Sequence, residues 1–407
     1  MQWLNRVMLR LLIENTLDRE EKIMAEWVEC TIGDLCDTIS DTYKGNDENV
    51  ILVNTSDVLE GKVLNHIQVP NKNLKGQFKK KFRKNDILFS EIRPANKRFA
   101  FIDFEDTSNY IASTKLMVLR HNEKVLPEYL FAILKSNYIL AELQHLAETR
   151  SGTFPQITFT SELAPMKVNL PDKKTQKQIV SILSNIEQKI DANESINNNL
   201  EQQAQTIYQQ MFIDNARSDC AEGTLSDIAD ITMGQSPSGS SYNEDGTGTI
   251  FFQGRAEFGF RFPSVRLYTT EPKRMARSND TLMSVRAPVG DLNVAHMDCC
   301  IGRGLAAIHS KSHHQSFVLY TMFSLKKQLD VFNGEGTVFG SINRNSLNDI
   351  PILIPSDDIL DEFERIVAPM DLTIRNNYDE NCRLQDIRDT LLPRLMSGEL
   401  DVSDIDI

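Results

Sequence analysis

Residues 85–98 read NDILFSEIRPANKR, and residues 279–290 read NDTLMSVRAPVG. Both stretches begin with an Asn-Asp pair, continue with large apolar side chains and then reach a serine. A turn that leads directly into a short β-strand has this pattern. Its return half a chain later indicates that the chain contains the same domain twice.

The repeat extends well beyond these two stretches. With an offset of 184 in the numbering, the chain aligns with itself from Gly152 onward without a gap, so that Leu163 meets Leu347 and Ile190 meets Ile374. Upstream the offset grows to 194 at the Asn-Asp pair, so insertions collect in the front part of each half. A period of roughly 190 residues predicts two whole domains rather than a solenoid.

Each half has a strand-rich front and a helical back. The front contains short β-branched and aromatic runs broken by Gly, Asn, Asp and Pro, and one short helix is expected at 127–136 and again at 315–329. Residues 173–217 contain no Gly and no interior Pro, which predicts a long helix. The expected fold class is α+β, with two pseudo-repeated α/β domains separated by two long antiparallel coiled-coil helices.

These patterns predict five segments. Residues 1–26 have an amphipathic pattern without a small-residue cleavage site, and they are interpreted as a helix or an upstream extension because Met24 is a plausible alternative start. The other segments are a first domain at 27–170, a central long helix at 171–217, a second domain at 218–354, and a C-terminal long helix and tail at 355–407.

The long segments carry a heptad repeat. Its first copy places Ile, Leu, Ile, Ile, Asn, Asn, Leu, Ala, Ile and Met at positions 179, 183, 186, 190, 193, 197, 200, 204, 207 and 211. Adding 184 gives Phe363, Val367, Met370, Ile374, Asn377, Asn381, Leu384, Arg388, Leu391 and Leu395. Arg388 departs from the pattern, and Pro369 and Pro393 are expected to weaken the second helix.

The central asparagines predict a register. If the two helices pack antiparallel about their midpoints, Asn193 falls opposite Asn381 and Asn197 opposite Asn377. Two such amide layers would lower stability but penalise every slipped register. In the alternative arrangement, the asparagines lie on a solvated flank and Ile196 takes the seam.

The composition, 41% hydrophobic and 25% charged residues, is typical of a soluble globular protein. No apolar run reaches the roughly 18 residues of a membrane span. The six cysteines form no CxxC pair and no metal-ligand spacing with the seven histidines, so we expect reduced, structural thiols in a cytoplasm.

The net charge of −13 argues at first against a nucleic-acid partner. However, residues 355–407 contain five Lys or Arg against fourteen Asp or Glu, so nine of the thirteen surplus negative charges lie there. Locally basic faces therefore remain possible on both front domains.

Basic clusters occur in both front domains. The stretch at 72–84, KNLKGQFKKKFRK, holds seven positive charges in thirteen residues, a density that fits phosphate contacts. In the second half, Gln can pair with adenine and Arg with guanine in a major groove. The alternative for each residue is a solvated loop. The candidates are Lys79, Lys80, Lys81, Arg83, Lys84, Arg93, Lys97 and Arg98 in the first half, and Gln253, Arg255, Arg261, Lys273, Arg274 and Arg286 in the second.

Motifs for catalysis are missing from the sequence. It contains no GxxxxGK[ST] phosphate loop, no Asn-Pro-Pro-aromatic site for amino methyl transfer, no HExxH and no GxSxG. We therefore expect neither catalytic residues nor a metal site in this chain.

Several longer stretches resemble the DNA-specificity subunit of type I restriction-modification enzymes. They are NDTLMSVRAPVGDLNVA, GTFPQITFTSELAPMKVNLPDKKTQKQIVSIL, AQTIYQQMFID and LLPRLMSGELDV, and the resemblance spans residues 27 to about 402. It implies that each front domain is a target-recognition domain that reads one half of a split site in double-stranded DNA. It also implies that the paired helices set the gap between half-sites and dock two methyltransferase subunits.

The resemblance has further implications for cofactors and partners. This chain would be a non-catalytic subunit that binds no cofactor, whereas S-adenosylmethionine would be used by the methyltransferase subunits, and ATP and magnesium by two restriction or motor subunits. The stretch EIRPANKRFAF stands where the second half has VRAPVGDLNVA, so the two domains are expected to read different half-sites.

A rigid antiparallel pair of protein helices could hold the two front domains at a fixed separation. One turn of the DNA double helix is ~34 Å, so this separation could equal one turn or more. Two alternatives from other classes remain. One is a duplicated coiled-coil scaffold for protein partners, in which the basic loops are incidental. The other is an enzyme with a diverged site.

Overall fold

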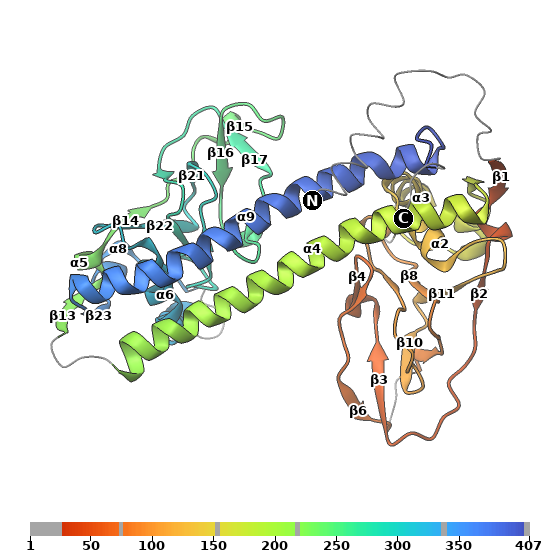
Figure 1. Cartoon of the computed structure of the whole chain (residues 1–407), viewed down its shortest axis with the longest axis horizontal. Coiled ribbons are helices and arrows are strands. Elements are labelled where there is room, and N and C mark those ends of the chain that lie inside the picture. The colour runs from red at the N-terminus through yellow and green to blue at the C-terminus, as the bar shows by residue number, and fades with distance from the viewer. Residues whose placement is uncertain (1–26, 73–75, 151–154, 216–219, 335–339, 403–407) are drawn as a thin grey trace. The chain divides into compact units, whose positions relative to one another are not determined.

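The computed structural model describes residues 27–72, 76–150, 155–215, 220–334 and 340–402 (Figure 1). The helix or extension expected at 1–26 lies outside these residues, as does Gly152, where the ungapped part of the repeat begins. The described residues form two compact units. The first runs up to Ile190 and resumes at Arg383, and the second is Asp191–Cys382.

Two multistranded sheets, a hairpin and a closing pair of strands make up the sheet structure of the first unit. Its helices are α2 (Pro127–Leu134), α3 (Asn137–Arg150) and the first part of α4 (Lys173–Tyr208). Its strands are β1 (Val28–Thr31), β2 (Cys36–Ile39), β3 (Asn49–Val53), β4 (Val58–Leu59), β5 (Lys62–Val63), β6 (Gln68–Pro70), β7 (Phe78–Lys80), β8 (Ile87–Ser90), β9 (Phe99–Phe101), β10 (Tyr110–Ser113), β11 (Leu116–His121) and β12 (Lys167–Leu170).

The second unit has the corresponding elements. Its helices are α5 (Leu225–Ile228), α6 (Gln315–Ser324), α7 (Lys326–Asp330), α8 (Arg344–Asn348) and most of α9 (Asp357–Met396). Its strands are β13 (Ala221–Thr224), β14 (Ala229–Met233), β15 (Tyr242–Asn243), β16 (Thr249–Phe252), β17 (Leu267–Thr269), β18 (Met275–Ala276), β19 (Thr281–Ser284), β20 (Leu292–Val294), β21 (Cys299–Ile301), β22 (Leu305–Ser310) and β23 (Pro351–Ile354).

The sheets of the two units match strand for strand. The order β2-β11-β8-β9 in the first unit corresponds to β14-β22-β19-β20 in the second, and both sheets are antiparallel. The order β6-β3-β10-β7 corresponds to β17-β16-β21-β18, with one parallel pair in each, and β15 is added at the edge. A third pair, β1 with β12 and β13 with β23, is antiparallel in both units.

The two recurring stretches become equivalent strands. They form β8 and β19, each fully buried and each lying between two neighbours of its sheet. Asn85 and Asn279, two residues before these strands, have φ angles of 67° and 72°. Asparagine tolerates this left-handed conformation better than most residues, which explains its presence at both turns.

The aspartate after each asparagine fixes the turn. The side chains of Asp86 and Asp280 each accept a hydrogen bond from the backbone amide three residues earlier, at 2.8 Å in both cases. Asp86 also receives both Nε and Nη2 of Arg120 at 2.7 Å, and Asp280 lies 2.6 Å from His309 Nδ1. The shared Asn-Asp pair therefore fixes the turn that precedes each strand.

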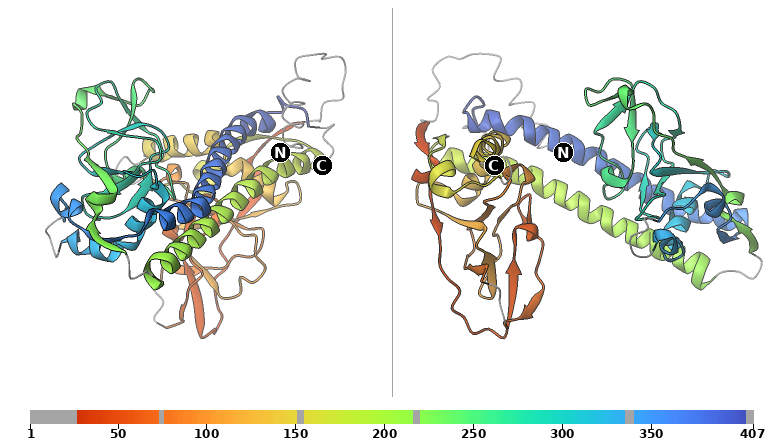
Figure 2. Two further views of the ribbon diagram at one scale, coloured as in Figure 1. Left: turned by 60° about the vertical axis from the view of Figure 1, so that its left-hand side comes forward. Right: turned by 180° about the vertical axis from the view of Figure 1, so that it is seen from behind.

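Each unit packs its sheets against the long helices. In the first unit one hydrophobic cluster joins Phe89 of β8 and Tyr129 of α2 to Ile190 of α4 and Leu384 of α9. In the second unit the equivalent cluster joins Met283 of β19 to Phe363 of α9. Figure 2 shows from two sides that α9 lies along α4 within each unit.

The long helices differ from the expectations at two places. Helix α4 ends at Tyr208 and a π-helical turn follows at Gln209–Asp214, so the regular helix is shorter than the predicted 171–217. Helix α9 continues through Pro369 and Pro393 over all 40 residues. Tertiary burial of neighbours such as Val367 and Leu391 outweighs the local cost of proline, since packing supplies most helical stability in proteins.

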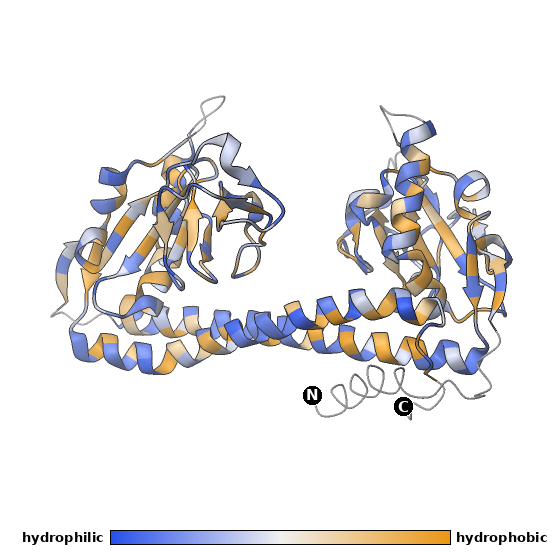
Figure 3. Ribbon diagram, turned by 90° about the horizontal axis from the view of Figure 1, so that it is seen from above, coloured by the Kyte–Doolittle hydropathy of each residue, from blue (hydrophilic) through white to orange (hydrophobic). Residues whose placement is uncertain are grey.

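Asparagines occupy the seam of the helical pair. The predicted register puts Asn193 opposite Asn381, and in the structure Asn193 Nδ2 donates to Asn381 Oδ1 at 2.8 Å. Asn377 Nδ2 donates to Asn197 Oδ1, also at 2.8 Å. Ile196 is 46% exposed, whereas Asn193 and Asn197 are buried, so Ile196 does not take the seam. The middle of both helices is correspondingly hydrophilic in Figure 3.

All six cysteines are free thiols, and burial raises the pKa of Cys36 and of Cys299 to about 12. Among the helices of the described ranges, none is long and apolar enough to cross a membrane.

Candidate nucleic-acid interface

The basic strand of the first unit lies at a sheet edge. Strand β7 is the outer strand in the order β6-β3-β10-β7, and Lys79 on it is exposed. The adjacent Lys80 points the other way, because successive side chains alternate across a strand. Its Nζ donates to the carbonyl of Leu116 at 2.8 Å, and burial lowers the pKa of its ammonium group. Lys80 therefore supports the sheet through this hydrogen bond, and its contact with DNA stays a prediction.

The residues after β7 remain near the surface. Lys81 places its Nζ 5.7 Å from the centre of the Tyr43 ring. Arg83 is exposed, and Lys84 pairs with the exposed Glu105 at 2.5 Å. Exposed ion pairs of this kind are weak and salt-sensitive, so Lys84 can exchange its carboxylate partner for a phosphate.

The loop after β8 carries a second group of cationic side chains. Arg93 and Lys97 flank the 3₁₀ turn Pro94–Asn96 with φ angles of 46° and 51°. Both side chains are exposed, although Lys97 lies 3.3 Å from Glu60. Arg98 instead donates from Nη1 to the carbonyls of Ser56 and Val58 at 3.2 and 3.4 Å, so its guanidinium braces the neighbouring loop.

In the second unit the exposed candidates are Gln253, Lys273, Arg274 and Arg286. The backbone of Gln253 packs closely against Gly302. A Cβ atom on Gly302 would lie 2.9 Å from the Cα and carbonyl oxygen of Gln253, a distance that real side chains do not tolerate. Only glycine permits this close approach, which fixes the backbone from which Gln253 projects.

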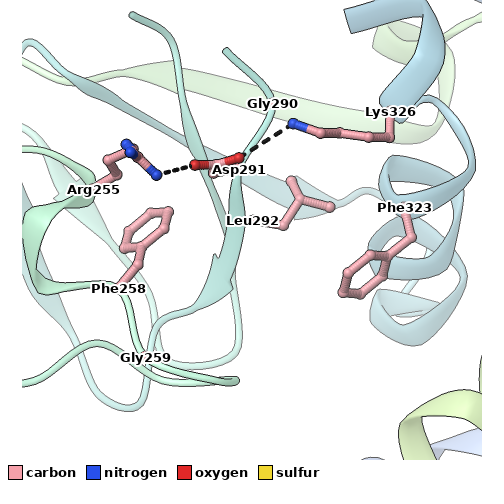
Figure 4. Close-up of a pocket in the computed structure, with 8 residues that line it drawn as sticks. All are labelled: Arg255, Phe258, Gly259, Gly290, Asp291, Leu292, Phe323 and Lys326. Atoms are coloured by element: carbon pink, nitrogen blue, oxygen red, sulfur yellow. Dashed lines mark hydrogen bonds and ion pairs between the residues drawn. The ribbon is translucent and has the colours of Figure 1, made fainter. Parts of the chain in front are cut away.

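Arg255 belongs to a row of three charges. It is half-exposed and its Nη1 donates to Asp291, whose other carboxylate oxygen lies 3.2 Å from Lys326 Nζ (Figure 4). Lys326 also donates to the carbonyl of Val289 at 3.3 Å. The row lies at a pocket that Phe258 and others line.

Arg261 has the opposite environment, and its assignment as a DNA contact is wrong. Its side chain is 4% exposed and lies 2.9 Å from Glu201 of α4 and 3.2 Å from Asp371 of α9. It also donates to the Tyr320 hydroxyl at 3.1 Å. Burial opposes its charge, but Tyr320, Asp371 and Glu201 outweigh burial and hold the pKa of Arg261 above its usual value. This buried cluster ties the loop to both long helices.

Reasoning from sequence missed several residues of these sites. Asp291, Lys326 and Asp371 carry no motif, and they reach Arg255 and Arg261 only through contacts between distant parts of the chain.

Exposed cations on the equivalent sheets of the two units can bind a polyanion. Exposed Gln and Arg side chains on loops with a fixed backbone can form hydrogen bonds to base edges. The structure brings Lys79, Arg83 and Arg93 to the surface of the first unit and Gln253, Lys273 and Arg286 to that of the second.

Comparisons with known proteins agree with this arrangement. A family model described as the type I restriction modification DNA specificity domain matches residues 24–202. The type I restriction enzyme HindI specificity subunit of Haemophilus influenzae is 31% identical, and the alignment covers 93% of this chain and all of that protein. The crystal structure of a type I restriction-modification system S subunit from M. genitalium is similar in fold, with a TM-score of 0.55 at 15% identity over 93% of this chain and 98% of that one.

Proposed function

The chain belongs to the DNA-specificity subunits of type I restriction-modification systems, and on this basis we propose that its two units read the two halves of an asymmetric DNA site. Residues 27–170 and 218–354 would be the two target-recognition domains. The subunit itself would be non-catalytic and would bind no cofactor.

One observation supports two different half-sites. The sheets β2-β11-β8-β9 and β14-β22-β19-β20 have the same order, yet the loops that follow β8 and β19 differ. After β8 the chain makes a 3₁₀ turn with exposed cations, whereas after β19 it places Asp291 against Arg255. A common scaffold with different polar groups on its loops is suited to reading different bases.

The long helices would act as the spacer. A helix rises about 1.5 Å per residue, so 36 and 40 residues provide spans of roughly 54 and 60 Å. The buried asparagine pairs would fix one register and with it the gap between half-sites.

The subunit would assemble with other proteins on double-stranded DNA. We expect two methyltransferase subunits that use S-adenosylmethionine and two restriction or motor subunits that use ATP and magnesium. The helical pair would dock the methyltransferase subunits, and this chain would give the complex its sequence preference.

Selection of bound duplexes from a random pool tests the proposal. With the methyltransferase subunits present, we expect recovered sequences with two fixed blocks separated by a constant unspecified gap. Binding should weaken steeply as salt increases, because phosphate contacts release counterions. Unselective recovery at low salt would instead favour a protein scaffold with incidental basic loops.

The spacer role has its own test. Deleting four residues from α4 breaks the heptad and shifts the register of everything beyond the deletion. We expect an altered gap or no specific binding. An unchanged gap in the same selection would remove the spacer role and leave the recognition role intact.

A further inference from the structure

A pocket in the second unit has the chemistry of a ligand site. Its volume is about 430 Å³, and its lining comes from η8 (Arg255–Glu257) and the loop after it, from the turn before β20 and the first residue of that strand, and from helices α6 and α7. Small-molecule sites fall between about 300 and 1,000 Å³, so the pocket can hold a planar ring system.

One side of the pocket is polar. Arg255, Asp291 and Lys326 form a continuous row in Figure 4, in which the carboxylate of Asp291 lies between the two cations. The row therefore offers hydrogen-bond donors on both sides of an acceptor. Because Asp291 holds both cations, their positions are set before a ligand arrives.

The other side is apolar. Phe258, Leu292 and Phe323 line it, and all three side chains are only partly buried. Gly259 and Gly290 also line the pocket. Two aromatic rings beside an open space provide faces on which a flat ring can stack.

We propose that this pocket binds a single unstacked nucleobase, with its ring against Phe258 and Phe323 and its edge on the row formed by Arg255, Asp291 and Lys326. The inference rests on the proposed function, because the base would come from the DNA that the second unit reads. Arg255 belongs to the same loop as Gln253, so the pocket adjoins the predicted reading loop.

Other ligands fit the pocket less well. A lone phosphate would meet two cations whose charge Asp291 already offsets in part, and it would leave the apolar side unused. An aliphatic group would fill the apolar side but would cover three charged groups without pairing them. A nucleobase satisfies both sides, since its faces are apolar and its edge carries donors and acceptors.

The row also predicts which bases fit. The row presents a donor, an acceptor and a donor, so it complements a base edge that presents an acceptor, a donor and an acceptor, as the two carbonyls and the N3–H of thymine do. Adenine, cytosine and guanine match this row only in part and should bind more weakly.

Fluorescence of 2-aminopurine tests the proposal in the assembled complex. The analogue is placed in turn at each position of the half-site that the second unit reads, and the full chain is bound together with its methyltransferase subunits. We expect a several-fold rise at one position with the wild-type chain. Asp291→Asn and Phe323→Leu should abolish that rise and weaken binding of this half-site by about tenfold, the scale of one lost base–aromatic stack.

Two matched variants serve as controls. Lys326→Ala should lose the signal, whereas Lys327→Ala, a change in the next lysine outside the pocket, should keep it. Phe260→Ala changes an aromatic residue of the same loop that is 50% exposed and does not line the pocket, and it should also keep the signal. Thermal melting checks that each variant is folded.

The outcomes separate the two proposals. Specific binding whose fluorescence signals survive both Asp291→Asn and Lys326→Ala would overturn the pocket proposal and leave the recognition function standing. A complex without any sequence preference would overturn the recognition function itself.

The source of the base can be distinguished with free nucleotides. Calorimetric titration of the full chain with each of the four deoxynucleoside monophosphates measures binding without a duplex. Binding of thymidine monophosphate that Asp291→Asn abolishes would identify a free nucleotide as an occupant. If neither the duplex nor a free nucleotide reports on Asp291, the pocket proposal is wrong.

Discussion

Arg255 and Arg261 belong to one loop and have opposite roles. Arg255 is half-exposed and pairs with Asp291 at a pocket, whereas Arg261 is buried against two acids. The stretch FFQGRAEFGFRFP cannot distinguish the two arginines, because the acids that pair with Arg261 lie far from this stretch in the sequence. One is on α4, well before the loop, and the other is on α9, well after it.

Replacing Arg261 by Ala should destabilise the second unit. The change leaves Glu201 and Asp371 without their cation in a buried site, and losing one partner of a buried ion pair costs about 3–5 kcal/mol. Chemical denaturation measures the loss. Arg274→Ala removes an exposed arginine of the same unit, so it should change stability little. Equal losses in both variants would contradict the role of the buried cluster.

Two equivalent aspartates cap the first turns of the units. The side chain of Asp34 accepts from the backbone amide and hydroxyl of Thr31, and Asp227 does the same with Thr224. These backbone and side-chain hydrogen bonds hold the pKa of both carboxyl groups below the usual value.

The capping aspartates predict a pH dependence. Since their pKa is lower in the folded state than in the unfolded state, the stability they contribute is present above the unfolded value of about 3.9 and is lost as pH falls through the folded value. Carbon NMR of the carboxyl groups should show both pKa values below about 3.9. Thr224→Val should raise the pKa of Asp227 and leave that of Asp34 unchanged; no change at Asp227 would contradict the hydrogen-bond cause.

Among the elements, the two long helices carry equivalent anchors. Glu187 of α4 and Asp371 of α9 occupy the same position of the repeat, since their numbers differ by its offset of 184. Glu187 pairs with Lys135 of the first unit, and Asp371 pairs with Arg261 of the second. The acidic residue occupies the same repeat position in both helices, whereas the cationic residue that pairs with it comes from a different element in each unit. Each strand-rich domain is therefore joined to a long helix by its own ion pair.

The asparagine layers should couple across the seam. Asn193→Leu or Asn381→Leu alone removes the hydrogen bond between the two amides, whereas the double variant places two apolar side chains together. A double-mutant cycle in denaturant should give a coupling of about 0.5–3 kcal/mol. As a control, Ile196→Asn changes an exposed residue and should stay within about 0.5 kcal/mol. Strict additivity of the two leucine changes would exclude direct pairing.

The sequence contains enough to predict the periodic elements. The heptad spacing identified the seam, because burial repeats locally along one helix, and the Asn-Asp pairs identified equivalent strands. The roles of Lys80, Arg98 and Arg261 were not predictable in this way. Their partners are backbone carbonyls and acids that only tertiary packing brings near, and no local pattern encodes which of several cations turns inward.

For the chain as a whole, binding to DNA must overcome a net charge of −13. Nine of the surplus negative charges belong to residues 355–407. They therefore lie outside the two segments that contain the exposed cations. Association with DNA should therefore depend on a few local phosphate contacts and should be sensitive to salt.

Lys79→Ala measures one such contact. It should weaken binding to every duplex alike and reduce the slope of log K against log salt by about 0.9, the value for one phosphate. Lys124→Ala removes an exposed lysine of the same unit outside the basic cluster and should leave the slope unchanged.

Gln253→Ala should leave the slope of log K against log salt unchanged but relax the sequence preference at one half-site. A uniform effect of Gln253→Ala would place it among the phosphate contacts.

The first and last strands of each recognition domain lie side by side. Val28 pairs with Leu170 through β1 and β12, and Ala221 pairs with Ile354 through β13 and β23. The chain therefore enters and leaves each domain at one place, next to the start of a long helix. In evolutionary terms, a recombination event that replaces the segment between two such strands exchanges one reader and leaves the helical pair intact. New specificities could then arise by exchange of segments between genes, without the gradual redesign of a shared core.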